Sequence, residues 1–547
     1  MIGTQVWTNK ADSIVDNNQT IFSTISDPIW IYTYNGPTQG DSHFKSVYQL
    51  STGDLAATGS LITGADLDWF TIRTDNEGGG ANDGQEWTDI RGSTNSEEAV
   101  SITQAVGGDD ITVAGYYMNN GEDYSLKRID NTGTSVWTRT YSEQYNQRPN
   151  QIISCSDGGF AIAGSYQSTL GAPPNAFILR TFGTGYEDWR ADFGAAGADE
   201  ALSVVQCSNG DFVLVGYTRS YGGSDKDLWV IRLDSTGTEI WNRVYGLSFD
   251  DWGEQIIQCE DGGFAIVGTT RSYGSSDQDI WLVRLNSTGH LLWHKFYGGV
   301  LDDYGKSIVE CDTGFALTGT TESYGSGNGD VILIRTDDSG NLLWRHEYGE
   351  NYADNGNSIV KCLDGGFVIA GDSKSWGGDD WDAFLMKVAD PPIWSVEPVN
   401  QELEYGVDFY YDLDAIATYI DEWWIDDEDQ FSINSNGVIT NDVVLAVGDH
   451  NLQISVNDTL GNVLTKSIVI SVIYSPSNHA WDPLWQRTFG STDDDRGSKI
   501  IECANGDLAI AGYENSYGAG SYDAWLARCG VRLGISLGAV GGPDVLR

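Results

Sequence analysis

Proline, basic residues and long apolar runs are all scarce in this sequence. Only 11 residues are proline whereas 67 are glycine, a balance typical of many tight turns between short strands. Lysine and arginine number 30 against 79 aspartates and glutamates, which gives a formal net charge of −49. A surface this acidic repels phosphate backbones and anionic lipid headgroups, so neither nucleic acid nor direct membrane insertion is expected. The charge favours solubility, hydrated cations or basic partners.

Several other signals are missing. No run of eighteen apolar residues is present, so no helix is expected to span a bilayer. The first residues, MIGTQVWTNKADSIV, lack a basic start and an apolar stretch, so no signal peptide is expected in them. The seven cysteines include no Cys-x-x-Cys pair, which argues against a thiolate metal site. In contrast, 40% of the residues are hydrophobic, enough for a packed core.

An internal repeat dominates the chain. Each period of about 52 residues contains four segments of alternating apolar residues, in one copy at about 307–311, 315–321, 330–336 and 342–348. Four antiparallel strands per period predict the blade of a β-propeller. Each period ends in a strand that begins around a tryptophan, and we expect this ring to pack between adjacent sheets. The eight copies are Trp30, Trp87, Trp137, Trp189, Trp241, Trp293, Trp344 and Trp485.

Counting the repeats predicts how the ring closes. Eight first-hairpin turns contain a glycine, and the last is followed by a third strand, YDAWLARC, but by no tryptophan strand. The chain begins with a spare strand of this kind, PIWIYTY at 29–35. We expect this N-terminal strand to complete the last blade, because an open edge invites aggregation. The prediction is therefore an all-β, eight-bladed propeller of four-stranded antiparallel blades; the alternative is seven blades plus a stray unit.

A polar motif recurs in five blades at the loop between the second and third strands. Because a catalytic set is needed once, five copies predict a turn in which the aspartate accepts backbone N–H groups and the aromatic ring covers the blade edge. Repeated cation binding is the alternative. The copies are Ser220, Tyr221, Gly222 and Asp227; Ser272, Tyr273, Gly274 and Asp279; Ser323, Tyr324, Gly325 and Asp330; Ser375, Trp376, Gly377 and Asp382; and Ser516, Tyr517, Gly518 and Asp523.

Six of the seven cysteines occupy one repeat position. The first two blades have Leu50 and Ala105 there, which indicates a small apolar core position. Neighbouring copies should lie too far apart for disulfides, so we predict buried free thiols. The state of Cys529 is left open. The six are Cys155, Cys207, Cys259, Cys311, Cys362 and Cys503.

The propeller rhythm stops between the third and fourth strands of the seventh repeat. Short strands without a helix signal predict an immunoglobulin-like β-sandwich at 390–478, inserted between propeller parts at 29–389 and 479–529. Residues 1–28 form an N-terminal extension, a cap or an added strand for a neighbouring subunit, and 530–547 a tail without a predicted role. Trp423 and Trp424 are a candidate contact point. Candidate oxygen ligands for Ca²⁺ are Asp412, Asp414, Asp426, Asp427, Asp429 and Asp458.

The repeat itself carries a resemblance. WHKFYGGVLDDYGKSIVE, GFALTGTTESYG and GDVILIRTDDSGNLLW resemble the short β-propeller repeat of bacterial and archaeal cell-surface proteins. YDLDA, FSINSNGVIT and VGDHNLQISVNDTLGN resemble the cadherin-like or immunoglobulin-like modules often fused to such arrays. LDSTGTEIW is also similar to the tryptophan-docking motif of quinoprotein dehydrogenases, but their cofactor pocket needs a pair of adjacent cysteines that this chain lacks.

These resemblances imply a non-enzymatic scaffold or adhesion protein, extracellular or on a cell surface, with no cofactor and no catalytic residue carried over. Its partner would be a protein or a glycan, and one version assembles with itself into a layer or filament. The alternative is a carbohydrate-binding protein or polysaccharide-active enzyme that uses one propeller face. A cytosolic interaction platform is a third reading, which the absence of a visible signal peptide allows.

Overall fold

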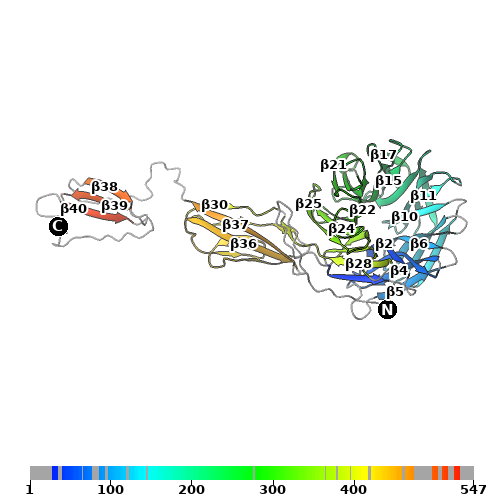
Figure 1. Ribbon diagram of the computed structural model, residues 1–547, viewed down its shortest axis with the longest axis horizontal. Coiled ribbons are helices and arrows are strands. Elements are labelled where there is room, and N and C mark those ends of the chain that lie inside the picture. The colour runs from blue at the N-terminus through cyan, green and yellow to red at the C-terminus, as the bar shows by residue number, and fades with distance from the viewer. Residues whose placement is uncertain are drawn as a thin grey trace. The chain divides into compact units, whose positions relative to one another are not determined.

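The computed structural model describes most of the chain up to residue 473 (Figure 1). The chain divides into two units, Met1–Val472 and Ile473–Arg547. Beyond Ile473 only the backbone of three strands is described. The described residues are 28–34, 40–64, 66–76, 85–92, 96–118, 122–142, 146–169, 171–274, 277–363, 365–376, 380–394, 396–416, 420–458, 462–473, 496–502, 508–514 and 523–529.

Seven four-stranded antiparallel sheets, here called blades 1 to 7, repeat along the first unit. Blades 1 to 3 contain β2 (Ser42–Gln49), β3 (Leu55–Thr63), β4 (Asp66–Thr74) and β5 (Gln85–Arg91); β6 (Glu97–Gln104), β7 (Ile111–Met118), β8 (Glu122–Ile129) and β9 (Ser135–Tyr141); and β10 (Gln147–Ser154), β11 (Phe160–Gln167), β12 (Pro174–Thr181) and β13 (Glu187–Phe193).

Blades 4 to 6 follow the same order of strands. They contain β14 (Asp199–Gln206), β15 (Phe212–Thr218), β16 (Asp227–Leu233) and β17 (Glu239–Tyr245); β18 (Asp251–Gln258), β19 (Phe264–Thr270), β20 (Asp279–Leu285) and β21 (Leu291–Tyr297); and β22 (Asp303–Glu310), β23 (Phe315–Thr321), β24 (Asp330–Thr336) and β25 (Leu342–Tyr348).

Blade 7 is assembled from both ends of the propeller sequence. Its first three strands are β26 (Asp354–Lys361), β27 (Phe367–Ser373) and β28 (Asp382–Val388), and its fourth is β1 (Trp30–Tyr34). Trp30 pairs with Lys387, just as Trp241 pairs with Arg232 in blade 4. The prediction that the N-terminal segment supplies a fourth strand is therefore confirmed.

The middle strands of the blades are buried on both faces. Every residue of β19 and of β20 is buried, because each blade is covered by a neighbour on either side. The outer strands keep an exposed or half-exposed alternation, as in β17. This difference explains why the second and third strands read as continuous apolar runs and the fourth does not.

Blade 7 packs directly against blade 1, so the ring closes with seven blades. Strand β2 packs against β26, β27 and β28, and Ser42 N donates to Trp381 O at 2.7 Å. Tyr32, Phe44, Phe70 and Leu385 share one buried core at this junction.

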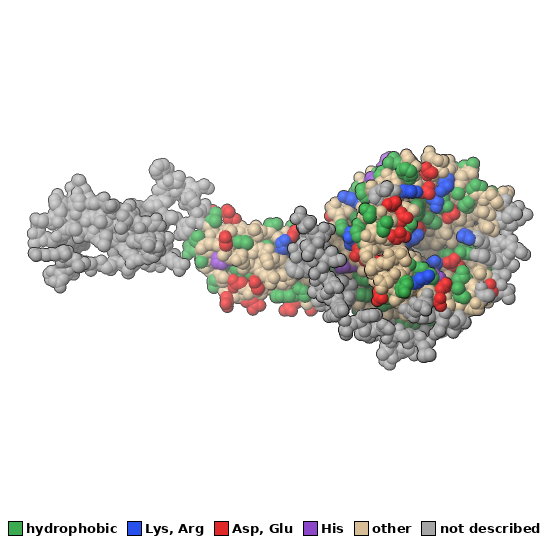
Figure 2. All heavy atoms as spheres, viewed as in Figure 1, with side chains coloured by type: hydrophobic (Ala, Val, Ile, Leu, Met, Phe, Trp, Pro, Cys, Tyr) green, Lys and Arg blue, Asp and Glu red, His purple; other side chains and the backbone are tan. Residues whose placement is uncertain are grey.

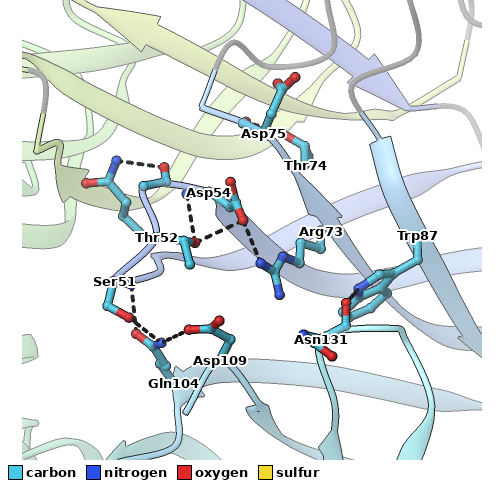
Figure 3. A network of polar contacts seen from close by, with 12 residues as sticks. Ser51, Thr52, Asp54, Arg73, Thr74, Asp75, Trp87, Gln104, Asp109 and Asn131 are labelled. Atoms are coloured by element: carbon cyan, nitrogen blue, oxygen red, sulfur yellow. Dashed lines mark hydrogen bonds and ion pairs between the residues drawn. The ribbon is translucent and has the colours of Figure 1, made fainter. Parts of the chain in front are cut away.

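The hydrogen bonds that join other blades recur at this junction. Ser51 N of blade 1 donates to Gln104 Oε1 of blade 2 at 2.9 Å (Figure 3). In the same way, Leu363 N of blade 7 donates to Gln49 Oε1 of blade 1 at 2.7 Å. The junction between blades 7 and 1 thus has the same polar contact as an ordinary junction between neighbours.

The predicted count of eight blades was therefore wrong. The strand at 29–35 was expected to pair with 523–529, but β1 pairs with β28. Strands β38 (Arg496–Glu502), β39 (Leu508–Glu514) and β40 (Asp523–Cys529) form a three-stranded sheet in the second unit. Their sequence repeats the blade pattern, and for this reason the sequence predicted one blade too many. Blade 7 ends after β28 without a fourth strand of its own, and β1 fills that edge instead of Trp485, which lies outside the described residues.

Residues 393–473 form a separate all-β module after the ring. A four-stranded sheet contains β30 (Gln401–Glu404), β33 (Ile420–Ile425), β36 (Gly448–Asp458) and β37 (Val463–Ile473). A three-stranded sheet contains β31 (Tyr410–Asp412), β34 (Phe431–Ile433) and β35 (Val438–Asn441), and β29 (Ile393–Trp394) pairs with β32 (Ala415–Ile416). Phe409, Trp423, Phe431 and Ile454 belong to one shared core. Because β1 already completes blade 7, the module does not interrupt a blade, contrary to the predicted insertion.

No helix in the part of the chain that the structure describes is long and apolar enough to cross a membrane.

Because β1 closes the propeller ring, removal of the residues after Val472 should not unfold it. A chain that ends at Val472 should keep the propeller's unfolding transition, because all seven blades lie before that residue. In contrast, Tyr32→Ala should lower the free energy of unfolding by about 3 kcal/mol, because it removes a buried aromatic ring from the closing junction. Thermal and denaturant unfolding of both chains measure this. Loss of the transition on truncation, with Tyr32→Ala unchanged, would instead indicate a ring that needs the last three strands.

Candidate functional site

Two sets of loops meet at one end of the ring, here called the loop end. One set joins the second and third strands of a blade, as in 219–226, 271–274 and 322–329. The other joins a fourth strand to the next blade's first strand, as in 246–250, 298–302 and 349–353. The sets are bonded together: Phe249 N donates to Ser272 Oγ at 3.2 Å, and Leu301 N donates to Ser323 Oγ at 3.0 Å.

The repeated polar motif forms a turn at the loop end, as predicted. In blade 4 Asp227 Oδ2 accepts a hydrogen bond from Gly223 N at 2.9 Å. Gly222 has a φ of 93°, a left-handed conformation that favours glycine. The ring of Tyr221 packs 5.5 Å from that of Trp229. The motif is thus turn structure in this blade, while Gly377 and residues 516–518 lie outside the described residues.

A second repeated aspartate, at the start of the first strand in blades 4 to 7, was not identified from the sequence. Asp251 accepts hydrogen bonds from Thr270 Oγ1 at 2.5 Å and from Leu247 N at 3.1 Å. It also accepts a hydrogen bond from Ser272 N at 3.2 Å, so it joins the two loop sets, and its side chain is fully buried. A spacing of 51 or 52 residues could have revealed the set, which comprises Asp199, Asp251, Asp303 and Asp354.

These two kinds of aspartate lie close together across three blade junctions. A Cβ placed on Gly349 would lie 1.9 Å from Asp330 Oδ1 and 2.6 Å from Asp354 Oδ2. The separation of the two oxygens is therefore at most the sum of those distances. Equivalent pairs are Asp227 with Asp251 around Gly246, and Asp279 with Asp303 around Gly298.

The pair at the junction between blades 6 and 7 contains an aspartate with a strongly raised pKa. Asp330 is buried, and its Oδ1 has no hydrogen-bond partner among the described residues. Burial, followed by the nearby charge of Asp354, raises the pKa of Asp330 to about 7.

The equivalent residues of two other blades differ from Asp330. In blade 7, burial and the charges of Asp380 and Asp41 raise the pKa of Asp382 to about 6. At the equivalent position blade 3 has an uncharged residue, Asn175.

Three of the predicted calcium ligands accept hydrogen bonds from nitrogen atoms of the module itself. Asp458 Oδ1 accepts from Asn462 N at 2.9 Å, and Asp427 Oδ2 accepts from Gln430 Nε2 at 2.6 Å. Asp426 Oδ1 accepts from Gln453 N at 2.8 Å. Among the residues that the structure describes, no group of three or more His, Cys, Asp or Glu side chains is arranged to hold a metal ion. The six candidates, which also include Asp412, Asp414 and Asp429, are therefore not brought together.

Trp423 and Trp424 point to opposite faces of β33, as the alternation predicts. Trp423 is buried, and its ring lies 5.8 Å from that of Trp394. Trp424 is half-buried. Its role as a contact point stays a prediction.

The prediction of buried free thiols is confirmed for Cys155, Cys207, Cys259, Cys311 and Cys362. Burial raises the pKa of Cys155, Cys259 and Cys311 to about 12 and that of Cys207 to about 11. The side chains of Cys503 and Cys529 lie outside the described residues.

A groove opens between the outer strands of blades 4 and 5. It measures about 210 Å³ and is lined by Val244, Tyr245, Gly246, Tyr273, Trp281, Leu291 and His294. Trp281 Nε1 donates to His294 Nδ1 at 3.0 Å, and the Tyr273 and His294 rings meet edge to face at 4.8 Å. Burial lowers the pKa of His294. The imidazole is therefore neutral at pH 7, with Nδ1 as an acceptor.

No known protein family and no curated protein matches the chain. Among solved structures, Sqt1 of Chaetomium thermophilum bound to the N-terminus of ribosomal protein L10 is 14% identical over 67% of this chain and 100% of its own, with a TM-score of 0.42. Puromycin hydrolase is 12% identical over 61% of this chain and 50% of its own, with a TM-score of 0.41. Similarities at this level assign no activity. The propeller fold rests on the strand pairing described above.

The thiols give a simple chemical prediction. In a chain that ends at Val472, the five described cysteines should not react with a thiol reagent within minutes, because burial excludes the reagent and disfavours the thiolate. All five should react after denaturation. Rapid reaction of the folded chain would show that the shared cysteine position is accessible.

The pair between blades 6 and 7 predicts a dependence of stability on pH. Between the ordinary pKa of 3.8 and about 7, the folded chain holds a proton on Asp330 that the unfolded chain has lost, so stability falls as pH rises through that window. Asp330→Asn removes this loss and should stabilise the chain at pH 8 by roughly 1–2 kcal/mol. The gain should disappear near pH 4.

Denaturant unfolding at several pH values measures the difference between variant and wild type. Asn175→Asp, which creates the same kind of pair with Asp199, should have the opposite sign. A gain for Asp330→Asn that does not change with pH would contradict the assignment.

Proposed function

We propose that the chain is a non-enzymatic scaffold or adhesion protein whose loop end docks a partner. The carrying observation is a row of exposed apolar side chains on three consecutive connecting loops. Leu247 is 60% exposed and Phe249 55% exposed after blade 4, Val300 is 78% exposed after blade 5, and Tyr352 is 61% exposed after blade 6. Large apolar side chains exposed on neighbouring loops support a binding face at this end of the ring.

Acidic residues alternate with this apolar row. Asp250, Asp302 and Glu350 occupy the same loops, and the whole chain has a formal net charge of −49. Apolar, acidic and basic side chains are interspersed on the face of the propeller seen in Figure 2. The partner that fits best is a protein segment with both apolar and basic side chains, since complementary charge speeds association and selects partners.

The setting that we propose is extracellular or on a cell surface. An acidic surface and the resemblance to surface propeller repeats support this setting. In this proposal the module at 393–473 is an immunoglobulin-like or cadherin-like unit that adds a second contact, and self-assembly into a layer or filament is one form of the function. A glycan partner is the alternative to a protein partner.

A pair of matched variants tests the docking face. Leu247→Ser, Phe249→Ser and Val300→Ser combined should weaken binding of the labelled chain to cells of its source organism at least tenfold, because apolar anchors carry most of the energy of an interface. The control combines Val106→Ser, Val136→Ser and Leu363→Ser, which are also exposed but lie at the opposite end of the ring. It should bind like wild type.

Treatment of the cells distinguishes the partners. Loss of binding after protease treatment supports a protein, whereas loss only after periodate oxidation identifies a glycan and contradicts the preferred partner. Equal binding by the two triple variants, or no binding by wild type, would overturn the docking face.

A further inference from the structure

The fourth strands of the blades carry different residues directly after the repeated tryptophan. Blade 3 has Arg190, blade 4 has Asn242, blade 5 has His294 and blade 6 has Arg345. These residues occupy equivalent places, because each preceding tryptophan pairs with the equivalent position of the third strand. The four blades thus show arginine, asparagine or histidine at one structurally equivalent position.

Where this position is arginine, the guanidinium covers an aromatic ring of its own blade. In blade 6 the Arg345 guanidinium carbon lies 3.5 Å from the centroid of Tyr324. In blade 3 the Arg190 guanidinium carbon lies 4.7 Å from the centroids of both Tyr166 and Phe177. The blade surface therefore presents aromatic faces that a guanidinium fits.

In blade 5 the shorter His294 occupies this position, and the groove opens beside it. Tyr273 is the counterpart of Tyr324 and lines the groove together with Trp281. In blade 5 the imidazole of His294 takes the place of that guanidinium, 4.8 Å from the ring of Tyr273. About 210 Å³ of open groove lies beside the aromatic wall that Tyr273, Trp281 and His294 form. That space is sufficient for the end of one arginine side chain.

The electrostatic field at this wall favours a cation. Gly246 lines the groove, and a Cβ on it would lie 2.3 Å from Asp227 Oδ1 and 2.8 Å from Asp251 Oδ2. Burial and then the charges of Asp251 and Asp227 raise the pKa of Tyr273. His294 is neutral at pH 7 and adds no opposing charge. An aromatic wall backed by carboxylates attracts a cation, and the planar guanidinium stacks on such rings better than ammonium does.

We propose that the groove between blades 4 and 5 binds the guanidinium of an arginine side chain from a partner, held against the aromatic wall of Tyr273 and Trp281. This site is additional to the docking face proposed at the loop end. Arginine binding at the groove can be measured whether or not the loop end has a partner.

Ligand-observed saturation-transfer NMR on the full chain tests the site with N-acetyl-arginine amide as the probe. The matched probe is N-acetyl-citrulline amide, which has nearly the same shape but no charge. We expect the arginine probe to bind at least tenfold more tightly than the citrulline probe. Equal binding of the two, or binding of neither, overturns the proposal.

Two substitutions locate the binding. His294→Arg supplies the groove with a guanidinium of its own, as in blade 6, and should abolish binding of the arginine probe. Asn242→Arg makes the same change one blade earlier, where the residue is not part of the groove lining, and should leave binding unchanged. The unfolding temperatures of the His294→Arg and Asn242→Arg variants are measured to check that both variants fold.

A third substitution covers the case in which His294→Arg does not fold. Tyr273→Leu keeps an apolar side chain but removes the aromatic face, and it should reduce binding of the arginine probe at least tenfold. Wild-type binding in either His294→Arg or Tyr273→Leu places the arginine elsewhere and contradicts the assignment.

Discussion

The whole propeller depends on the pairing of one short strand, β1, with β28. Blade 7 has only three strands, β26 to β28, from its own part of the sequence. The chain supplies the fourth strand, β1, from the other end of the propeller sequence. The junction is then held by the same contacts as the others, with a buried aromatic core and a glutamine that accepts a backbone N–H. Without this pairing, β28 would be an open sheet edge, which is a site for aggregation.

Much of the fold was predictable because the repeat is periodic. The four strands per blade, the turn around Asp227 and the buried cysteines all follow from residues that recur at fixed spacing. The blade count was not predictable in this way, since the pattern around β38 to β40 repeats that of a blade. Which edge β1 would occupy depends on where the chain leaves the ring after β28, and periodicity does not encode that.

The site was harder to predict because it forms between blades. The partners Asp330 and Asp354 belong to different sheets, so their proximity follows from how neighbouring blades pack. The groove beside Tyr273 likewise lies between two blades, and its residue His294 occupies a position where blades 3, 4 and 6 have arginine or asparagine. The constant residues of the repeat build the ring.

Hydrogen exchange in β1 tests the closure most directly. If β1 completes blade 7, those amides of Trp30–Tyr34 that are hydrogen-bonded to β28 should exchange as slowly as those of β28, and they should do so in a chain that ends at Val472. Exchange of these amides at the rate of an unstructured segment would contradict the closure, as would protection that requires residues 523–529.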